Sequence, residues 1–372
     1  MERCVSVRKT GAGLRTAVEK ALEDIGGLDQ LVSPGDRVVL KPNINGTECV
    51  TSVGVVETLL ELLHDCSVTD MAIAEATFGG SGMTARCFAA NGYGDLARRW
   101  DIDLINLNDS EPVKLPVANP LITDTISVAR EIVEADRLIN IPVMKVHYAT
   151  GITLCLKNLK GILVGDEKRR FHEVGLDRAI ADLNRTVSPD LNLVDAVECM
   201  ERMGPRGGDM VTMNLVLAGR TSAYVDAVGA RVMGFEAGEI GHLQQFCAVT
   251  GLNPGDAQPV GDAVESVQRP FERADLSNSP AATASIRNID ACSSCMNALI
   301  LSLMSSEGVD LSGYQFCLGS TFGDDRDDEA HRTVAFGKCA IAALDTADVI
   351  VPGCPPYPFE LRGRLSDKRR DE

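Results

Sequence analysis

Five cysteines lie close together in the C-terminal quarter of the sequence. A C-x2-C pair can bind one metal centre from a single turn. Two more thiolates would complete either a tetrahedral zinc site or the four-cysteine ligand set of an iron–sulfur cluster. We expect no secretory signal at the N-terminus, so a metal site is favoured over a disulfide framework. The five are Cys292, Cys295, Cys317, Cys339 and Cys354.

The later cysteines do not form a second zinc knuckle. Structural zinc sites usually use two C-x2-C pairs, whereas a whole helix-like and strand-like segment separates Cys339 from Cys354. This separation favours a [4Fe–4S] cubane, whose irons need ligands from several directions. Zinc, or no metal at all, remain the alternatives. Cys317 fits as a fifth nearby thiol, as a ligand of a different cluster type, or as a core residue.

A basic segment is the second stretch whose residue types could do chemistry. Residues 141–178 contain seven Lys and Arg against four Asp and Glu, in a chain whose net charge is −17. A local excess of positive charge in an acidic protein predicts an anionic ligand, a carboxylate or a phosphate. Lys145 could clamp such an anion, and His147 or His172 could move a proton near neutral pH. These three are the candidate catalytic residues.

Apolar runs alternate with helical patterns, which predicts an α/β fold with a largely parallel sheet and flanking helices. In such a sheet the carboxyl ends of the strands share one edge, where ligands bind. Expected helices cover 54–66, 175–187 and 221–235, and the expected strands of the larger part are 37–42, 71–76, 103–107, 137–143, 191–197 and 213–219. Polar residues follow or end these strands, and we expect them to converge: Lys41, Asn43, Glu75, Lys145, His147 and Asp195.

The same reading divides the chain into two domains. Residues 1–255 form the large α/β domain, 256–284 a connection rich in Pro, Ser, Asp and Gly, 285–360 a smaller β/α module, and 361–372 a solvated tail. Within the module we expect strands at 285–290, 313–319 and 349–353 and helices at 296–308 and 338–348. The cysteines then follow strands or open helices at one sheet edge, so four sulfurs can converge.

Composition excludes several classes of function. The negative net charge argues against general nucleic-acid binding, and no apolar run is long enough for a membrane span, so we expect a cytoplasmic protein. The phosphate-binding P-loop and the G-x-S-x-G signature are both missing, and "TGAGLR" (10–15) is a weak dinucleotide signal. The remaining cysteines are expected to be buried or half-buried free thiols: Cys4, Cys49, Cys66, Cys87, Cys155, Cys199 and Cys247.

The cysteine segments "CSSC", "GKCA" and "VIVPGCPPYP" resemble the cluster-binding pattern of the nickel–iron hydrogenase small subunit and its respiratory complex I homologue. The resemblance covers about 85 residues, and its last segment is the most specific. In that family these residues hold a [4Fe–4S] cluster. The resemblance therefore implies that Cys292, Cys295, Cys339 and Cys354 are the ligands, and it offers no counterpart for Cys317.

The larger part of the chain resembles the family called domain of unknown function 362, over about residues 35–260. "VVLKPNINGT", "IAEATFGG" and "LINIPVMKVHYATGITLCLKNLKGIL" carry the likeness. The shared signature falls on Lys41, Pro42, Asn43, Lys145, His147, Lys157, Asn158, His172 and Asp195. Members often carry ferredoxin-type clusters, and this chain departs from them with a hydrogenase-like module. Adding Glu75, the implied substrate-binding residues are Lys41, Asn43, Glu75, Lys157, Asn158 and Asp195.

These observations predict an iron–sulfur oxidoreductase. A [4Fe–4S] cluster in the small module would pass single electrons to or from an anionic small molecule in the large domain. The alternative is a protein that carries electrons, or matures a metallocofactor, for a partner enzyme. A redox partner protein could dock on the acidic loop 319–333, which otherwise reads as a solvated loop, and a homodimer is compatible with the sequence.

Overall fold

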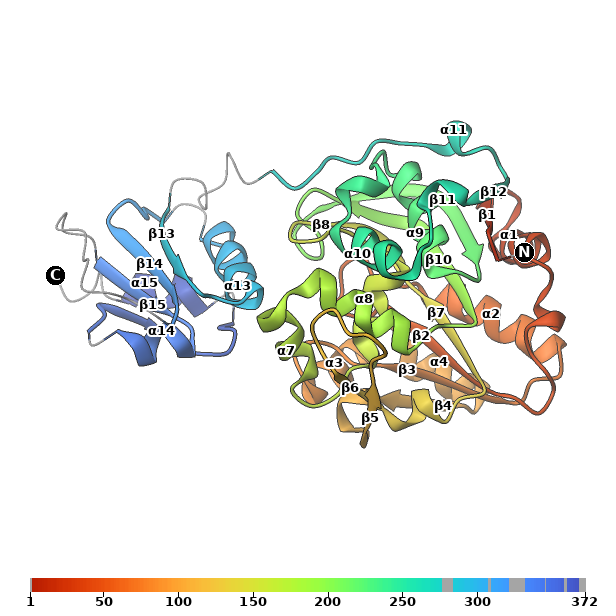
Figure 1. Cartoon of the computed structure of the whole chain (residues 1–372), viewed down its shortest axis with the longest axis horizontal. Helices are drawn as coiled ribbons and strands as arrows, with labels where there is room; N and C mark the ends of the chain where they lie inside the picture. Colours follow the sequence, from red (N-terminus) through yellow and green to blue (C-terminus); the bar gives the residue numbers. More distant parts are fainter. Residues whose placement is uncertain are drawn as a thin grey trace. The chain divides into compact units, whose positions relative to one another are not determined.

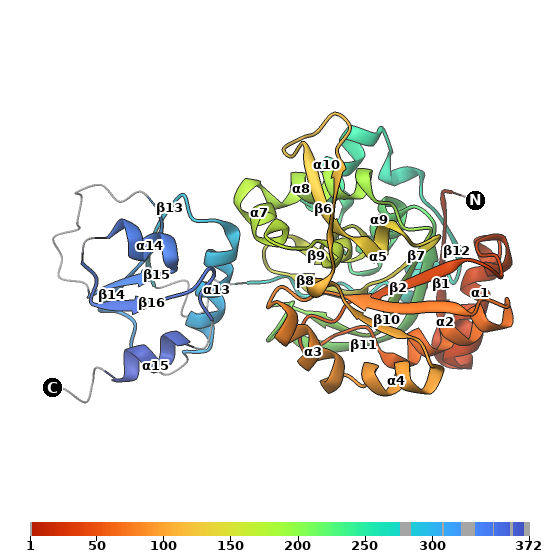
Figure 2. The same ribbon diagram turned by 90° about the horizontal axis from the view of Figure 1, so that it is seen from below.

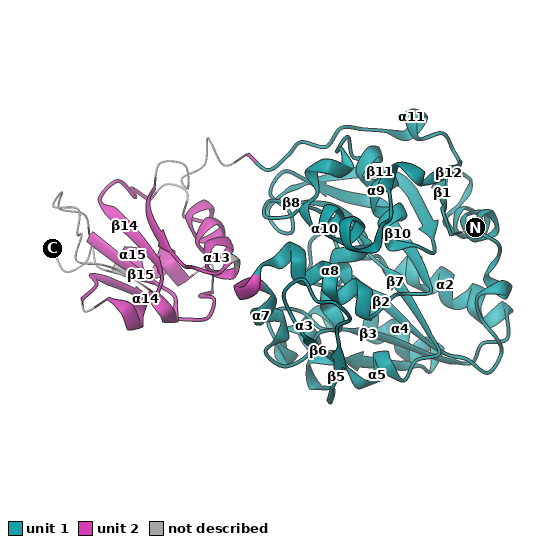
Figure 3. Ribbon diagram, in the orientation of Figure 1, with its two compact units in different colours: residues 1–171, 175–274 teal, residues 172–174, 275–372 magenta. Residues whose placement is uncertain are grey.

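The chain forms two compact units, coloured separately in Figure 3. A computed structural model describes residues 2–275, 284–306, 309–320, 332–344, 346–357 and 360–367. The first unit contains residues 1–171 and 175–274, and the second contains 275–372 together with His172–Val174. Each unit has its own sheet and its own hydrophobic core.

The first unit is built on a sheet in which ten strands are described (Figure 1). The main path runs β12-β1-β11-β10-β7-β2-β3-β4, and β8 pairs with β10 and β9. Most neighbours are parallel, but β11 runs antiparallel to β1 and β10, and β9 to β8. The strands are β1 (Cys4–Lys9), β2 (Arg37–Pro42), β3 (Asp70–Glu75), β4 (Asp103–Asn106), β7 (Arg137–Ile141), β8 (Val143–His147), β9 (Gly151–Thr153), β10 (Leu191–Glu201), β11 (Asp209–Gly219) and β12 (Gln258–Gly261); β5 (Pro112–Pro116) and β6 (Thr125–Ala129) form a separate antiparallel pair.

Helices cover both faces of this sheet, as Figure 2 shows. Helices α1 to α4 pack on one face, and α6, α8, α9 and α10 pack on the other. No helix among the described residues is long and apolar enough to cross a membrane. The helices are α1 (Leu14–Asp24), α2 (Val53–Asp65), α3 (Ser81–Ala90), α4 (Tyr93–Trp100), α5 (Arg130–Val133), α6 (Cys155–Asn158), α7 (Glu167–Val174), α8 (Leu176–Thr186), α9 (Ser222–Val232), α10 (Gly241–Thr250) and α11 (Val264–Val267), with a 3-10 turn η4 at Leu159–Ile162.

The two-residue period of the strands explains the two cores. In β10, Leu191 and Leu193 point into the core under α1 and α2, and Val194 and Ala196 point into the core under α8 and α9. Successive side chains of a strand face opposite sides, so an apolar run buried on both faces is typical of a central strand. Ser52 starts α2 by accepting a hydrogen bond from the Val55 backbone N–H.

The second unit has a smaller sheet whose described strands, in the order β13-β14-β15-β16, are all parallel. Its core packs α13 and α15 against the sheet through apolar residues such as Leu299, Phe316 and Leu361. The elements are β13 (Ser285–Ile289), α13 (Ser293–Met304), β14 (Tyr314–Gly319), β15 (Arg332–Phe336), α14 (Lys338–Ala343), β16 (Val349–Val351) and α15 (Glu360–Asp367).

The predicted fold class is confirmed: the protein is a mixed α/β protein with a mostly parallel sheet and flanking helices. One expected strand, 137–143, is two strands, because Pro142 has no backbone N–H for the ladder and β7 ends before it. Strand β15 was not predicted. The seven isolated cysteines are free thiols, and Cys4 and Cys66 are half-buried while the others are buried, as expected.

Domain limits differ from the expectation in two places. Part of the expected connection 256–284 belongs to the first unit, because β12 pairs with β1 and Phe271 is buried in the core. The expected tail begins with helix α15, whose Leu361 and Leu365 are buried. Residues 276–283 of the connection, 321–331 of the acidic loop and 368–372 of the tail lie outside the described residues.

Candidate functional site

Five lysines of the first unit interact electrostatically in a continuous series, which we call the lysine cluster. The charges of Lys145 and Lys160 lower the pKa of Lys157. The charge of Lys168 lowers the pKa of Lys160, and the charge of Lys41 lowers the pKa of Lys168. Lys41, Lys145 and Lys168 are buried, and Lys157 and Lys160 are half-buried. The sequence prediction of a positive focus is thus matched by a group of cations drawn from β2, β8, α6, η4 and α7.

One buried carboxylate, Glu75 at the end of β3, lies within the lysine cluster. Its Oε2 lies 2.9 Å from Lys41 Nζ, and its charge also acts on Lys145 and Lys168. Gly161 of η4 packs directly on this ion pair, since a Cβ there would collide with Glu75 Oε1 and lie 2.6 Å from Lys41 Nζ. The predicted residues Lys41 and Glu75 therefore meet, and a glycine that was not predicted makes room for them.

Lys145 is held by the backbone and by a side-chain amide. Its Nζ donates to Asn43 Oδ1 at 3.0 Å and to the Cys49 carbonyl at 2.9 Å. Asn43 Nδ2 in turn donates to Asn158 Oδ1 at 2.7 Å. Both Asn43 and Asn158, predicted to bind substrate, thus use their amides on each other and on Lys145, and they position that lysine.

The amide series continues through the sheet. Asn158 Nδ2 donates to Asn140 Oδ1 at 2.8 Å, and Asn140 Nδ2 donates to Asn192 Oδ1, also at 2.8 Å. A lysine ammonium can only donate, so the oxygen of Asn43 must face Lys145. That requirement fixes the orientation of every following amide. We call Asn43, Asn158, Asn140 and Asn192 the amide chain.

Burial disfavours the charged form of each lysine in the cluster. Desolvation lowers the pKa of Lys41, Lys145 and Lys157, and it lowers the pKa of Lys160 and of Lys168 to about 7. Neighbouring ammonium groups lower the pKa of Lys157, Lys160 and Lys168 further. Several cations around one carboxylate favour a bound anion, which would restore their charge.

The other predicted residues of the first unit have different surroundings. Asp195 lies inside β10, not at a strand end, and its carboxylate accepts from the Ser52 and Val197 backbone N–H groups at 2.8 and 3.1 Å. Lys145 likewise lies inside β8, whereas His147 is the last residue of that strand. The ring of His147 stacks on Tyr148, and its Nδ1 accepts from the Ala149 N–H at 3.1 Å.

Two predicted residues lie at the margins of this group. Lys157 Nζ donates to Thr153 Oγ1 at 3.5 Å, so it joins the cluster through charge more than through hydrogen bonds. His172 lies on α7 in the stretch His172–Val174, which Figure 3 assigns to the second unit.

The predicted cysteine ligands of the second unit follow three parallel strands. Cys292 immediately precedes α13 after β13, Cys295 lies in the first turn of α13, Cys339 lies in α14 after β15, and Cys354 follows β16. Each strand runs parallel to the next, so all four thiols belong to the carboxyl edge of one sheet. Cys295 is buried and Cys292 half-buried, whereas Cys339 and Cys354 are exposed.

Backbone contacts bring the segments of these cysteines together. The Gly337 N–H donates to the Val351 carbonyl at 2.9 Å, and the Lys338 N–H to the Gly353 carbonyl at 2.8 Å. A Cβ at Gly337 would lie 3.1 Å from Cys295 Sγ and 3.6 Å from Pro356 Cδ. The G-K-C and P-G-C-P-P segments and the C-x2-C pair thus meet at Gly337, which has φ +96°.

The cysteines also interact electrostatically. A hydrogen bond with Cys295 lowers the pKa of Cys292 to about 6, and the pKa of Cys295 is raised by that bond, by burial and by the thiolates of Cys354 and Cys339. Within the described part of the chain, no group of three or more His, Cys, Asp or Glu side chains could hold a metal ion as it stands. The cluster assignment therefore stays a prediction.

Cys317 lies on β14 and is buried. Its Sγ lies 3.9 Å from Gln315 Oε1. Burial raises the pKa of its thiol, as expected for a thiol enclosed by protein. Its burial is compatible with a core residue, and the other two readings that the sequence left open stay predictions.

Sequence reasoning missed several residues that build these sites. Asn140 and Asn192 lie in strands and were expected only as strand residues. Gly161 follows "KNLK" directly and was not singled out, and Gly337 was included only as part of the "GKCA" segment. A glycine beside a cluster of charged or metal-ligating residues was the available signal, because close approach of another group is a common reason for glycine.

Comparison with known proteins gives relatives of limited similarity. The thylakoid-associated protein sll1697 of Synechocystis is 28% identical over 263 residues, covering 66% of this chain and 77% of that protein. The lactate racemase apoprotein of Thermoanaerobacterium thermosaccharolyticum gives a TM-score of 0.41 at 16% identity, covering 59% of this chain and 55% of that one. A protein from Thermotoga maritima gives a TM-score of 0.34 at 15% sequence identity, covering 54% of each chain. This chain thus spans little more than half the length of either solved structure.

A family match covers the part of the first unit that carries the whole lysine cluster and the whole amide chain. It extends over residues 38–231, just over half of the 372 residues, and its family is described as Domain of unknown function (DUF362). The expected family resemblance over the large domain is therefore confirmed. This chain belongs to the DUF362 family.

Proposed function

We propose that this protein is an iron–sulfur oxidoreductase that binds a small anion in its first unit and a [4Fe–4S] cluster in its second. The observation that carries the proposal is the placement of Cys292, Cys295, Cys339 and Cys354 at one edge of a parallel sheet. A redox partner protein is the one-electron donor or acceptor, and the bound anionic substrate or cofactor is the other reactant.

The residues of the second unit suit a cubane. In a [4Fe–4S] cluster each of the four cysteine thiolates binds a different iron. The four sulfurs therefore need not surround a single point, as they do around a zinc ion. Gly337 has no side chain, which leaves space beside Cys295 Sγ. When bound, the cluster supplies single-electron transfer. The four cysteines would hold it, and Pro355 and Pro356 follow Cys354 directly.

In the first unit the lysine cluster binds the anion. Lys157 and Lys160 are only half-buried, so they are the members that reach a ligand, while Lys145 is buried and held by Asn43. The buried Lys41–Glu75 pair lies within the cluster and adds no net charge to it. His147, beside Tyr148 at the end of β8, is the candidate for moving a proton to or from the bound anion.

The proposal is tested on anaerobically purified protein. We expect equal amounts of iron and acid-labile sulfide, broad visible absorption that bleaches with dithionite, and an EPR signal of the reduced protein. Cys354→Ala should lose most of the iron, and Cys317→Ala, which alters a buried cysteine outside the proposed ligand set, should keep it. A colourless protein containing zinc, or a Cys354→Ala variant with a full iron load, would contradict the cluster assignment.

A second candidate is favoured by one observation, the exposure of Cys339 and Cys354. A cluster with two ligands at the surface can exchange electrons with a docked protein, so the chain could act as an electron carrier or in metallocofactor maturation. Reduced protein would then be oxidised by a partner enzyme at a rate that Lys157→Gln and Lys160→Gln leave unchanged. An oxidoreductase acting on an anion bound at the lysine cluster would be slowed by both substitutions.

A further inference from the structure

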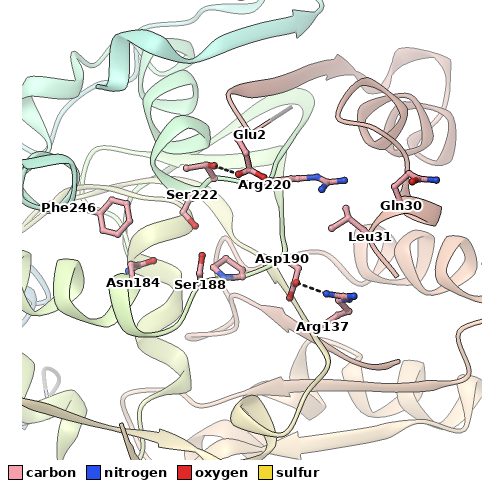
Figure 4. A pocket seen from close by; sticks show the side chains of 12 residues that line it. Glu2, Gln30, Leu31, Arg137, Asn184, Ser188, Asp190, Arg220, Ser222 and Phe246 are labelled. Carbon is pink, nitrogen blue, oxygen red and sulfur yellow. Dashed lines mark hydrogen bonds and ion pairs between the residues drawn. The ribbon is translucent and has the colours of Figure 1, made fainter. Parts of the chain in front are cut away.

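A cavity of about 300 Å³ lies in the first unit at the sheet edge opposite the lysine cluster. It lies where β7 and β10 begin and β11 ends, so it faces the amino ends of β7 and β10. Lys41 lies near the carboxyl end of β2, which runs parallel to β7. Its volume is at the lower end of the range for small-molecule sites. Figure 4 shows side chains from several separate segments around it.

Two buried polar atoms of the cavity wall have no hydrogen-bond partner among the described residues. They are Asn184 Oδ1 and Arg220 Nε. The Asn184 side chain is 4% exposed, and Figure 4 shows it projecting toward Ser188. Its Nδ2 donates to the Leu156 and Ile180 carbonyls, so a structural role accounts for the donor end of this amide only. An unpaired buried acceptor is costly, which favours a ligand that donates to it.

The charged residues of the wall are not all paired with one another. Arg137 and Asp190 form an ion pair at 3.2 Å, visible in Figure 4. Glu2 accepts a hydrogen bond from Thr221 Oγ1 at 3.1 Å, and the structure shows no ion pair for it or for Arg220 in the described chain. Glu2 is exposed and Arg220 is half-buried, so one anion and one cation are available to a ligand, and a ligand that uses both is close to neutral overall.

The start of helix α9 adds a second binding element. Ser222 is the first residue of this helix and lines the cavity, so the free N–H groups of its first turn lie beside Arg220. Together they favour a carboxylate. Ser222 Oγ also donates to Asn192 Oδ1 at 3.3 Å, which joins the cavity wall to the amide chain.

We propose that this cavity binds a small zwitterion of the amino acid class. Its carboxylate binds Arg220 and the start of α9, and its ammonium group donates to Asn184 Oδ1 and Glu2. Phe246 and Leu31 provide apolar wall for a side chain. This site is separate from the lysine cluster, which is positive and suits an anion.

Each standard L-amino acid is added singly to the full chain, and binding is measured by saturation-transfer NMR. We expect at least one to bind with a Kd on the order of 1 mM or tighter. Acetate and methylamine, which carry one charge each, should bind at least about tenfold more weakly. Arg220→Gln should weaken amino acid binding by about tenfold or more, and Glu2→Gln should weaken it less.

Two variants serve as controls. Arg231→Gln removes an exposed arginine of the same helix that pairs with Glu265, and Lys157→Gln alters the lysine cluster; both should bind like wild type. The proposal is overturned if no amino acid binds, if acetate binds as well as the best amino acid, or if Arg220→Gln binds unchanged. Loss of binding in Lys157→Gln would place the ligand at the lysine cluster and overturn it equally.

Discussion

Lys41 Nζ lies 2.9 Å from Glu75 Oε2, and the two side chains are 0% and 5% exposed. Their charges come from neighbouring parallel strands, β2 and β3. A buried ion pair gains little over apolar residues, but removing one partner leaves an uncompensated charge. The pair therefore has a structural role in the lysine cluster, whereas the half-buried lysines are the members that can bind a ligand.

Gly161→Ala should break this pair. The new Cβ would collide with Glu75 Oε1 and lie 2.6 Å from Lys41 Nζ, and both atoms are enclosed by protein. We expect a loss of about 2–4 kcal/mol in the free energy of unfolding, measured in urea. Gly94→Ala is the matched control, because no atom lies within 4 Å of its Cβ position. Equal stability of the two variants would contradict the packing of Gly161 on the pair.

A double-mutant cycle measures the pair itself. Lys41→Met and Glu75→Leu should each destabilise the protein by about 3–5 kcal/mol, because each leaves one charge buried alone. The double variant should lose clearly less than the sum of the two, since both charges are then gone. Urea unfolding of the four proteins provides the test. Strict additivity would show that the two residues act independently.

Anion binding should weaken as the pH rises through 7. Desolvation lowers the pKa of Lys160 and of Lys168 to about 7, so both are charged below that pH and largely neutral above it. Sulfate keeps its charge over the range, and its affinity should fall by about tenfold or more between about pH 6 and pH 9. The free energy of unfolding should change in the opposite direction. In the unfolded chain these lysines have a pKa of 10.5, so between pH 7 and pH 10.5 the unfolded state binds more protons and the folded state becomes more stable as the pH rises.

Lysine methyl groups labelled with carbon-13 report each titration by NMR. Two resonances with midpoints near 7 should disappear in Lys160→Gln and Lys168→Gln, one in each. Added sulfate should shift the Lys160 midpoint upward. Midpoints that remain near 10 for both lysines would contradict the burial of the cluster, and an affinity for sulfate that does not change with pH would place the anion elsewhere.

The sequence was sufficient for the elements that have strong periodicity. Expected strand 37–42 coincides with β2, and expected helix 54–66 differs from α2 by one residue at each end. Apolar alternation and caps are local, so they can be read from one segment. Strand β15 was missed because its neighbours β14 and β16 define it more than its own five residues do.

The candidate sites were predictable only in part. The expectation that polar residues converge at the strand ends was correct for Lys41 and Glu75. The amide chain, by contrast, joins asparagines that are spread over 150 positions of sequence: Asn43, Asn158, Asn140 and Asn192. Nothing in one segment indicates that its asparagine will donate to another one. The prediction that Asp195 and Lys145 lie at strand ends was wrong, because β10 and β8 extend beyond the apolar runs that were used to place their ends.

Asn140→Ala should show that the amide chain acts as a unit. It removes the shortest hydrogen bond of Asn158 Nδ2 and of Asn192 Oδ1, and both residues are buried. We expect a loss of about 2–4 kcal/mol in stability by urea unfolding, whereas the exposed cap Asn253→Ala should cost about 1 kcal/mol or less. A loss in Asn140→Ala no larger than in Asn253→Ala would contradict the role of the chain.

Gly337→Ala tests the cluster pocket without removing a ligand. Its Cβ would lie 3.1 Å from Cys295 Sγ, and alanine is strained at φ +96°. Since α14 carries Cys339, a shift of this residue moves Cys339 away from Cys295, and we expect iron content to fall by half or more. Gly313→Ala has open space at its Cβ position and should keep its iron. If Gly337→Ala instead retains all of its iron and an unchanged visible spectrum, the four cysteines do not meet at this glycine.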